Sequence, residues 1–147
     1  MTWSWAELKI ANASSSSASA ARRLRRAANA DDDEAFAIFN SAQDHVIRCA
    51  RVHIDRVVLE AFTAGSARCE DEEAADLLRD VCTLYALCTI EDDLAWFMAH
   101  NRMSDQRAKV VTTELNEMLE KLRPHLLTLV EGFGVPEKAW ATEMLAD

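Results

Sequence analysis

The sequence predicts an all-α fold, an antiparallel helical bundle of three long helices with short flanking helices and a proline kink in the third long helix. Only three Gly and two Pro occur among the 147 residues, and half of the residues are apolar. The apolar residues recur at intervals of three and four, which is the period of an amphipathic helix. We expect a flexible leader at residues 1–17 and a single helical domain at residues 18–147.

The leader contains Trp3 and Trp5, followed by a serine run from Ser14 to Ser17 that is typical of a linker. A helical pattern begins at Ala18 and carries four closely spaced arginines. These side chains either contact an anion or phosphate, or form a solvated face that pairs with acidic helices of the same chain. The four arginines are Arg22, Arg23, Arg25 and Arg26.

The first long helix is expected to begin at Asp31–Asp33, because carboxylates accept hydrogen bonds from the free N–H groups of a first turn. Gly65 is expected to end this helix. His45 and His53 lie about two turns apart, too far to bind one ion together, so packing or capping roles are predicted for both. The apolar positions are Phe36, Phe39, Val46, Ala50, Ile54, Val57, Ala61 and Phe62.

The central helix is the most apolar segment, and it is expected to continue unbroken as far as Asn101. The acidic cluster Glu70–Glu73 is interpreted as its first turn rather than as a metal site. A stripe this wide needs neighbouring helices on two sides. Glu91–Asp93 interrupts the stripe, where the helix is expected to turn a face to water or to a partner chain. The stripe consists of Leu77, Val81, Leu84, Cys88, Ala95 and Met98.

The third long helix is expected to start after Ser104, whose hydroxyl suits an N-cap. Pro124 removes a backbone donor and disfavours helix at the preceding residue, so a kink or break is predicted at Leu122–Pro124. Gly132 and Gly134 are expected to stop the helix, and Pro136 to start a short final helix. The stripe consists of Val111, Leu115, Met118, Leu122, Leu126, Leu129 and Phe133.

Composition narrows the classes of function. The net charge of −9 argues against general nucleic-acid binding, and the longest uncharged helical run, Val81–Ile90, is too short to span a membrane. No secretion signal opens the sequence, and the final Leu-Ala-Asp is not a peroxisomal address, so we expect a cytoplasmic protein. The four cysteines are expected to be buried free thiols, and they are Cys49, Cys69, Cys82 and Cys88.

Spacing alone identifies no catalytic or metal site. None of the four histidines follows a glutamate by three residues, which excludes the Glu-x-x-His pattern of di-iron bundles. The sequence also lacks a His-Glu-x-x-His zinc motif, a glycine-rich phosphate loop and a Gly-x-Ser-x-Gly nucleophile motif. We therefore predict no catalytic residue and no metal ligand.

Two stretches carry a resemblance to a known family. LYALCTIEDDLAWFMAHNRMS, read together with LRPHLLTLVEGFGVP, resembles the C-terminal helical domain of acyl-CoA oxidases, within the acyl-CoA dehydrogenase superfamily. The likeness runs from about Ser19 to Pro136. Leu94-Ala95 and Glu131-Gly132 depart from the pairs that the family often has there. The matching residues are Leu84–Leu87, Ile90-Glu91, Trp96-Phe97, Arg123–His125, Leu129-Val130 and Phe133–Pro136, with Ala21–Leu24, Gln43–His45 and Val57–Phe62 upstream.

The resemblance implies a part of an FAD-dependent enzyme that desaturates acyl-CoA in fatty acid β-oxidation. In such oxidases the catalytic glutamate and most of the flavin pocket lie in preceding domains, so this chain alone is expected to bind no cofactor and to serve packing and dimer assembly. The expected partner is a second copy or a flavin-bearing acyl-CoA oxidase-like chain, with no nucleic acid and no membrane. The alternative is a free-standing protein–protein interaction module derived from the same domain.

Four residues are candidates for the interface with that partner: Trp96, Phe97, Arg123 and Phe133. The three aromatic residues are either core residues or interface anchors. Arg123, beside the predicted break, pairs either with a carboxylate of the partner or internally with Glu91 or Asp92.

Overall fold

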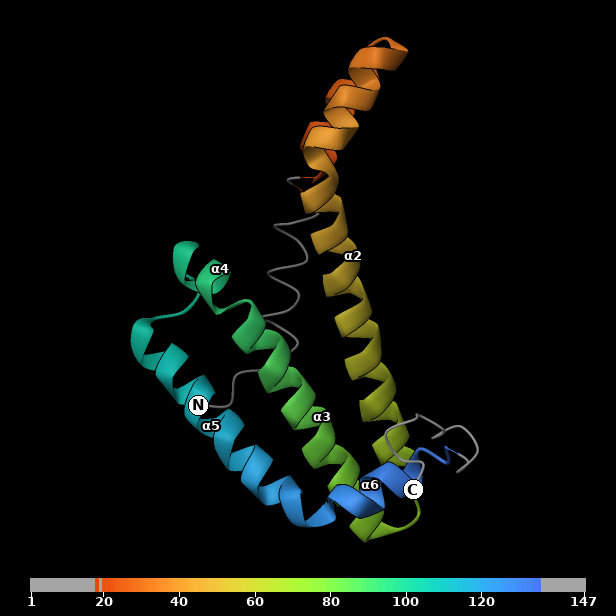
Figure 1. The fold of residues 1–147 in the computed structure, drawn as a ribbon, viewed down its shortest axis with the longest axis vertical. Coiled ribbons are helices and arrows are strands. Elements are labelled where there is room, and N and C mark those ends of the chain that lie inside the picture. Colours follow the sequence, from red (N-terminus) through yellow and green to blue (C-terminus); the bar gives the residue numbers. More distant parts are fainter. Residues whose placement is uncertain (1–17, 19, 136–147) are drawn as a thin grey trace, which may run out of the picture.

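The computed structural model describes residues 18 and 20–135, and this part of the chain consists of helices and turns without a strand. The three long helices are α2 (Asp32–Arg68), α3 (Glu72–Asp92) and α5 (Asp105–Leu122). They run antiparallel to their neighbours, with α3 in the middle and in contact with both α2 and α5 (Figure 1). The predicted all-α architecture is therefore confirmed, as is the need of the central helix for neighbours on two sides.

Helix α2 starts where the sequence predicted and ends later. The Asp31 carboxylate accepts a hydrogen bond of 2.9 Å from the backbone N–H of Glu34, so it caps the helix as expected. The prediction that Gly65 ends the helix is wrong, because Gly65 does not adopt the left-handed conformation of a terminating glycine. The helix continues to Arg68 and ends where the N–H of Cys69 bonds the carbonyl of Ser66.

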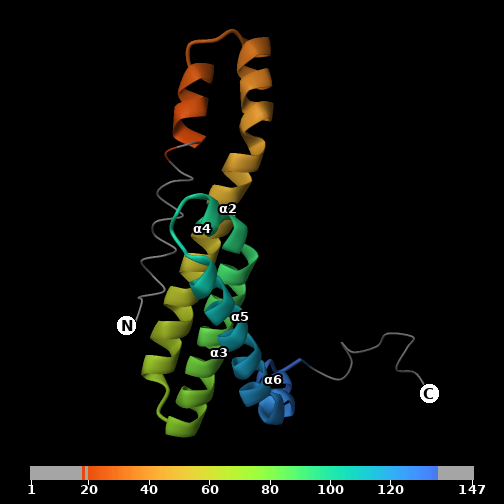
Figure 2. The same ribbon diagram turned by 90° about the vertical axis from the view of Figure 1, so that its left-hand side faces the viewer.

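The first half of α2 extends beyond the end of α3 (Figure 1). Residues 20–27 form a short helix that folds back along this half of α2 (Figure 2). Ala20 and Ala42 are both buried, and their small side chains allow two helices to approach closely. At 37 residues α2 is roughly 55 Å long, so the molecule is elongated along this helix. The predicted leader at residues 1–17 lies outside the described residues.

The central helix is not continuous, which corrects the prediction of one helix as far as Asn101. It breaks at Asp93, whose φ of −103° and ψ of 8° separate α3 from the short helix α4 (Leu94–Ala99). Helix α4 then ends at Asn101, which adopts a left-handed conformation with φ of 53°. The N–H of Arg102 bonds the carbonyl of Phe97 at 2.8 Å, which is the hydrogen bond of a Schellman motif.

The third long helix follows its prediction. Ser104 caps α5 through its hydroxyl, and the helix ends at Leu122, immediately before Pro124. A 3-10 turn, η1 (Arg123–His125), joins it to the short helix α6 (Leu126–Gly132). The predicted break at the proline is confirmed, and so are the stop signals, since Gly134 has a φ of 59°. The predicted final helix from Pro136 lies outside the described residues.

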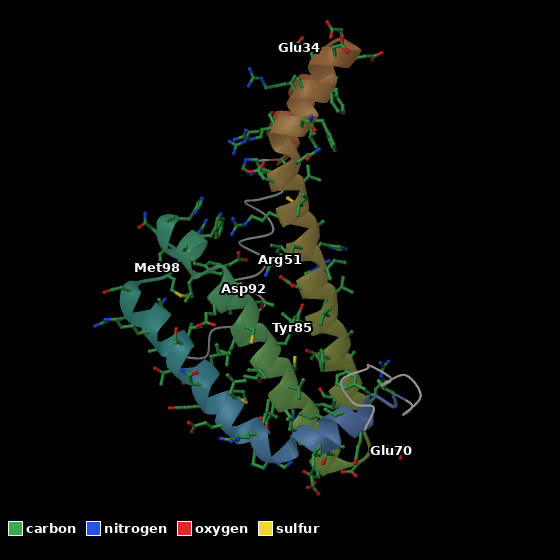
Figure 3. The ribbon with its side chains drawn as sticks, in the orientation of Figure 1. Glu34, Arg51, Glu70, Tyr85, Asp92 and Met98 are labelled. Carbon is green, nitrogen blue, oxygen red and sulfur yellow. The ribbon has the colours of Figure 1, made fainter. Side chains whose placement is uncertain are left out.

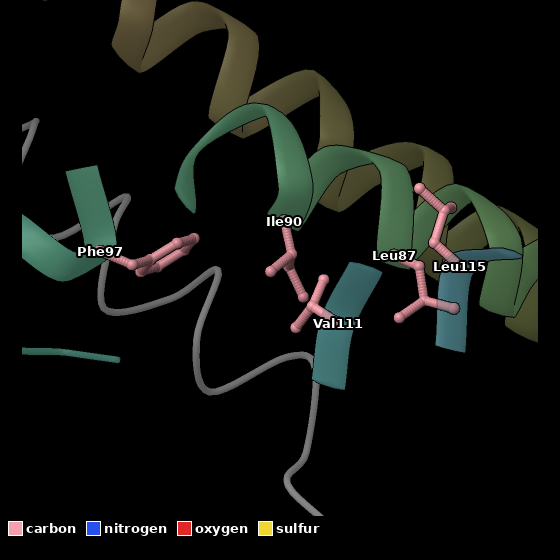
Figure 4. Close-up of a cluster of buried hydrophobic side chains, with 5 residues drawn as sticks. All are labelled: Leu87, Ile90, Phe97, Val111 and Leu115. Carbon is pink, nitrogen blue, oxygen red and sulfur yellow. The ribbon is translucent and has the colours of Figure 1, made fainter. Parts of the chain in front are cut away.

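The hydrophobic core lies between α3, α4 and α5. Figure 4 shows its five buried side chains, which reach toward one another from these three helices. Phe97 is the largest of them and is fully buried, because the break at Asp93 lets α4 lay its ring beside the residues of α3 and α5. The five residues are Leu87, Ile90, Phe97, Val111 and Leu115.

The cysteines are less buried than predicted. Cys88 is exposed, and Cys49, Cys69 and Cys82 are half-buried free thiols. Burial and the carboxylates of Glu91 and Asp92 raise the pKa of the Cys88 thiol, in that order of importance. Among the described residues, no helix is long and apolar enough to cross a membrane.

Replacing Phe97 with Ala is expected to lower the free energy of unfolding by about 3–5 kcal/mol, because it removes a fully buried ring and leaves a cavity. Its neighbour Met98 is 41% exposed, so Met98→Ala is the matched control and is expected to cost less than about 1 kcal/mol. Urea unfolding followed by circular dichroism measures both. Equal losses for the two variants would contradict the assignment of Phe97 to the core.

Candidate assembly surfaces

Two ion pairs join α2 to the end of α3. The guanidinium of Arg48 donates a hydrogen bond of 2.7 Å to Asp93, and Arg51 bonds Asp92 one turn further along (Figure 3). The first pair is the more buried, with side chains 35% and 15% exposed, against 58% for each member of the second. Asp92 and Asp93 of the acidic cluster therefore pair with α2 of the same chain, while Asp92 is also exposed to water, as the sequence predicted.

Trp96 belongs to the same cluster of side chains. Its ring lies 5.4 Å from the Arg48 guanidinium carbon, within the range of a cation–π contact, and it stacks on the His100 ring at 4.2 Å. The ring also meets Phe97 edge to face at 5.4 Å. Trp96 is consequently half-buried, with contacts on several sides inside its own chain.

A polar contact ties the middle of α3 to α2. The Tyr85 hydroxyl donates a hydrogen bond of 2.9 Å to Asp55, which is buried, and the Phe62 ring stacks on the Tyr85 ring (Figure 3). Burial, followed by the hydrogen bond and the charge of Asp55, raises the pKa of Tyr85 to about 12. The phenol therefore stays protonated and keeps donating its hydrogen bond over the whole physiological pH range.

Helix α2 is apolar on a second side, turned away from α3. We call this side the α2 outer face. It carries large side chains whose exposed fractions lie between 43% and 66%, which is unusual for residues that are elsewhere buried. These side chains are Phe36, Phe39, Ile47, Ile54 and Val57.

Helix α6 carries another exposed apolar surface, which we call the α6 patch. Its members recur at the spacing of one helix face, and their exposed fractions lie between 40% and 80%. Arg123 is also exposed and begins the 3-10 turn η1 that leads into α6, so a cation lies three residues before the patch in the sequence. The members of the patch are Leu126, Leu127, Val130 and Phe133.

The structure separates the four candidate interface residues. Phe97 is a core residue, so the alternative of an interface anchor does not hold for it, and Trp96 is largely occupied within its own chain. Phe133 is 80% exposed on the α6 patch. Arg123 is exposed as well, and Asp92, one of its two expected internal partners beside Glu91, is paired with Arg51 instead.

The histidines of α2 and the four arginines of the preceding helix are partly or fully exposed to solvent. His53 is exposed, which contradicts the packing role predicted for it. His45 is half-buried, and its Nε2 atom lies 3.8 Å from the Oδ2 atom of Asp44. No group of three or more potential metal ligands gathers within residues 20–135. The four arginines from Arg22 to Arg26 are all exposed, as both the anion contact and the solvated face require.

The fold thus defines an all-α domain with uncovered apolar surfaces. The family described as acyl-CoA oxidase matches this chain over residues 8–139. Because this match covers most of the sequence, the chain belongs to the acyl-CoA oxidase family, a family of fatty acid metabolism. The resemblance carried by the stretches around Trp96 and Pro124 is confirmed.

Three relatives show what fraction of a family member's length this chain matches. The chain is 27% identical over 101 residues to an acyl-coenzyme A oxidase-like protein of Mus musculus, a match covering 69% of this chain and 16% of the relative. It is 26% identical to peroxisomal acyl-coenzyme A oxidase 2 of Arabidopsis thaliana, covering 69% and 15%. For peroxisomal acyl-coenzyme A oxidase 1 of Bos taurus the identity is 25%, covering 65% and 14%. The matched region is therefore about a seventh of each relative.

One hollow of the described surface lies beside the ion pairs of α2. It has a volume of about 900 Å³ and lies between α2, the start of α4 and Arg22. Its charged lining consists of Arg22, Arg48 and Arg51 with Asp44, Asp92 and Asp93, and the last two carboxylates pair with the arginines of α2. No glycine-rich phosphate loop lines it.

Tyr85 is the only tyrosine of the chain, so its titration can be followed by the absorbance of tyrosinate. We expect a midpoint near pH 12 in the folded protein and near pH 10 in guanidinium. Because the folded pKa is raised, the stability that Tyr85 contributes is complete below pH 10 and is lost as the pH rises to 12. Asp55→Asn is expected to lower the midpoint. A folded midpoint near 10, with helicity intact, would contradict the contact.

The two ion pairs predict different coupling energies in double-mutant cycles. For Arg48→Ala with Asp93→Ala we expect roughly 1–2 kcal/mol, because this pair is the more buried and shares its cation with Trp96. The exposed Arg51–Asp92 pair is the matched control and is expected to give less than about 1 kcal/mol. Urea unfolding of the single and double variants measures both, and the opposite order would contradict the assignment.

Proposed function

We propose that this chain is a terminal helical domain or small subunit of an FAD-dependent acyl-CoA oxidase or dehydrogenase, which desaturates acyl-CoA in fatty acid β-oxidation. It serves packing and dimer assembly, and it leaves the chemistry to a flavin-bearing chain. A cytoplasmic location remains part of this proposal, although two of the relatives are named as peroxisomal proteins.

The α6 patch carries the proposal. Four large apolar side chains face solvent on one short helix, and Arg123 adds a positive charge at its start. A central apolar anchor with a charged neighbour at its edge is the usual composition of a protein–protein interface. Phe133 and Leu127, the most exposed of the four, are the expected anchors.

Two further observations support a role in assembly. The match spans about a seventh of each relative, which leaves room for a separate flavin-bearing part in a complete enzyme. The α2 outer face adds a second set of exposed large apolar side chains, which is typical of a surface that another chain or domain covers. We assign the chemistry to that other part, as the family resemblance implies. The flavin is accordingly assigned to the partner.

The test is an affinity pulldown of the tagged chain from its native cell, with the eluate scanned for flavin absorbance. The wild-type chain is expected to co-purify a yellow acyl-CoA oxidase-like chain. Phe133→Asp is expected to weaken this association at least tenfold, because burying a phenylalanine contributes about 1.5–3 kcal/mol and the carboxylate adds a desolvation cost. Val110→Asp is the control, since Val110 is also an exposed apolar residue, at 56% against 80% for Phe133, but lies on α5, away from the patch.

A colourless eluate that contains only this chain would contradict the proposal. It would favour the alternative of a free-standing interaction module derived from the oxidase domain. Equal recovery of the flavoprotein with Phe133→Asp and with Val110→Asp would retain the partner but exclude the α6 patch as the contact.

A further inference from the structure

Helix α6 receives little support from the rest of the described chain. It is seven residues long, and none of its side chains is buried against residues 20–135. The element that it contacts most is the adjoining 3-10 turn η1. Isolated helices shorter than about 12–15 residues are marginally stable in water, and most helices in proteins depend on the packing of an apolar face. The α6 patch is such a face, so a cover over the patch would stabilise the helix.

The sequence that follows the patch has the composition of such a cover. Val135 is the last described residue, two positions after Phe133 of the patch. The next twelve residues, which we call the 136–147 segment, include the short helix that the sequence predicts from Pro136. The helical period places the apolar residues of this segment on one side of the predicted helix. These residues are Trp140, Ala141, Met144 and Leu145.

The end of α6 allows the chain to reverse toward the patch. Gly134 has a φ of 59°, the left-handed conformation that ends a helix and turns the chain. Its N–H bonds the carbonyl of Glu131 at 2.9 Å, which closes the last turn. Pro136 follows two residues later and suits the first turn of a new helix. In a helical hairpin centred on Gly134, Leu127 and Ala141 lie at the same level, because each is seven residues from the turn.

The length of the segment matches the length of the surface. Residues 123–133, from η1 to the end of the patch, and residues 137–147 are both eleven residues long. Each spans roughly 16 Å as a helix, so the segment reaches from one end of the patch to the other. The short connection also gives the segment a high effective concentration at the patch. A separate chain has no such advantage.

Charge favours the patch over the opposite side of α6. Thr128 lies two residues from both Leu126 and Val130, so it points away from the patch. It borders a hollow of about 490 Å³ whose acidic lining consists of Asp71, Glu73, Asp76 and Asp80. The 136–147 segment is itself acidic, with three carboxylates, one ammonium group and a net side-chain charge of −2. Like charges therefore disfavour the hollow as its binding site.

The patch presents the opposite charge to the segment. Arg123 is exposed and lies three residues before the first patch residue. Glu143 and Asp147 lie in the second half of the segment, and a hairpin that turns at Gly134 brings this half toward Arg123. The two carboxylates are four residues apart, which is the spacing of neighbours on one helix face. The apolar and the charged residues thus favour the same placement.

We propose that the 136–147 segment folds back as a short helix and covers the α6 patch of the same chain, with the Trp140 ring packed against Leu127 and Val130. The occupant of the patch is therefore a segment of this chain. The inference deepens the proposed function and rests on it in one respect, because the flavin-bearing partner is assigned to the same patch. The segment shields the patch until that partner replaces it.

The first test measures amide hydrogen exchange of the full chain, with no other protein present. Trp140→Asp and Met144→Asp are each expected to speed exchange in α6 at least tenfold, because the helix loses its cover. Thr142→Asp is the matched control, since residue 142 lies two positions from both Trp140 and Met144 and faces away from them in the predicted helix. Exchange in α3 is expected to stay the same in all three variants, which confirms that the fold is intact.

The second test traps the hairpin by disulfide formation. In a background with the four native cysteines replaced by serine, Leu127→Cys and Ala141→Cys are combined in one chain and oxidised. A disulfide within the chain is expected to form at least tenfold faster than in the control, which combines Thr128→Cys with Ala141→Cys. Thr128 suits the control because it borders the hollow on the opposite side of α6. A mixture of the two single variants, Leu127→Cys and Ala141→Cys, is expected to form no link between chains.

Three results would overturn this inference. The first is equal exchange of α6 in the wild type and in both aspartate variants of the apolar side. The second is equal rates of disulfide formation for the two cysteine pairs. The third is a link between chains in the mixture, which would assign the cover to a second copy. The flavin-bearing partner is absent from both tests, so these results leave the proposed function standing, whereas a pulldown without flavoprotein leaves the cover standing.

Discussion

The position of α3 between two helices is the constraint on which the rest of the fold depends. Toward α5 and α4 it presents Leu87 and Ile90, and this side forms a dry core. Toward α2 it presents Tyr85 and the two aspartates at its end, and this side is held by hydrogen bonds and ion pairs. Because both sides of α3 are used, α2 and α5 do not close on each other, and their far sides remain uncovered.

Most helix ends were predictable from local sequence signals. The carboxylate at Asp31, the hydroxyl at Ser104 and the ring of Pro124 act within one turn of their own position, so each was predictable from its neighbours in the sequence. The break at Asp93 has no such local signal, and the side chain of Asp93 bonds Arg48, 45 residues earlier in the sequence. The prediction that the helix ends at Gly65 was wrong for a different reason, because a glycine permits a helix to end but does not require it to end.

For the candidate interface residues too, the sequence pattern does not predict which side chains are buried and which are exposed. Phe97 and Phe133 both occupy apolar positions of helical stripes, and only the fold shows that one is buried and the other exposed. None of the apolar residues predicted on α2 is fully buried, because the buried side of the helix carries Ala42, Val52, Asp55 and Ser66 instead, and helical spacing alone does not assign a stripe to core or solvent. Phe36 and Ile54 were recognised as apolar, but their lack of cover became evident only with α3 in place.

The order of the helices in the layer has a consequence for how the chain folds. Each long helix contacts the one that follows it in the sequence, so the stabilising contacts join segments that are close along the chain. Such a topology has low contact order and is expected to fold fast. During synthesis, α2 and α3 can form their ion-paired hairpin before α5 has left the ribosome. The apolar side of α3 remains exposed to solvent until α5 has been synthesised. During this interval the nascent chain is most prone to aggregate.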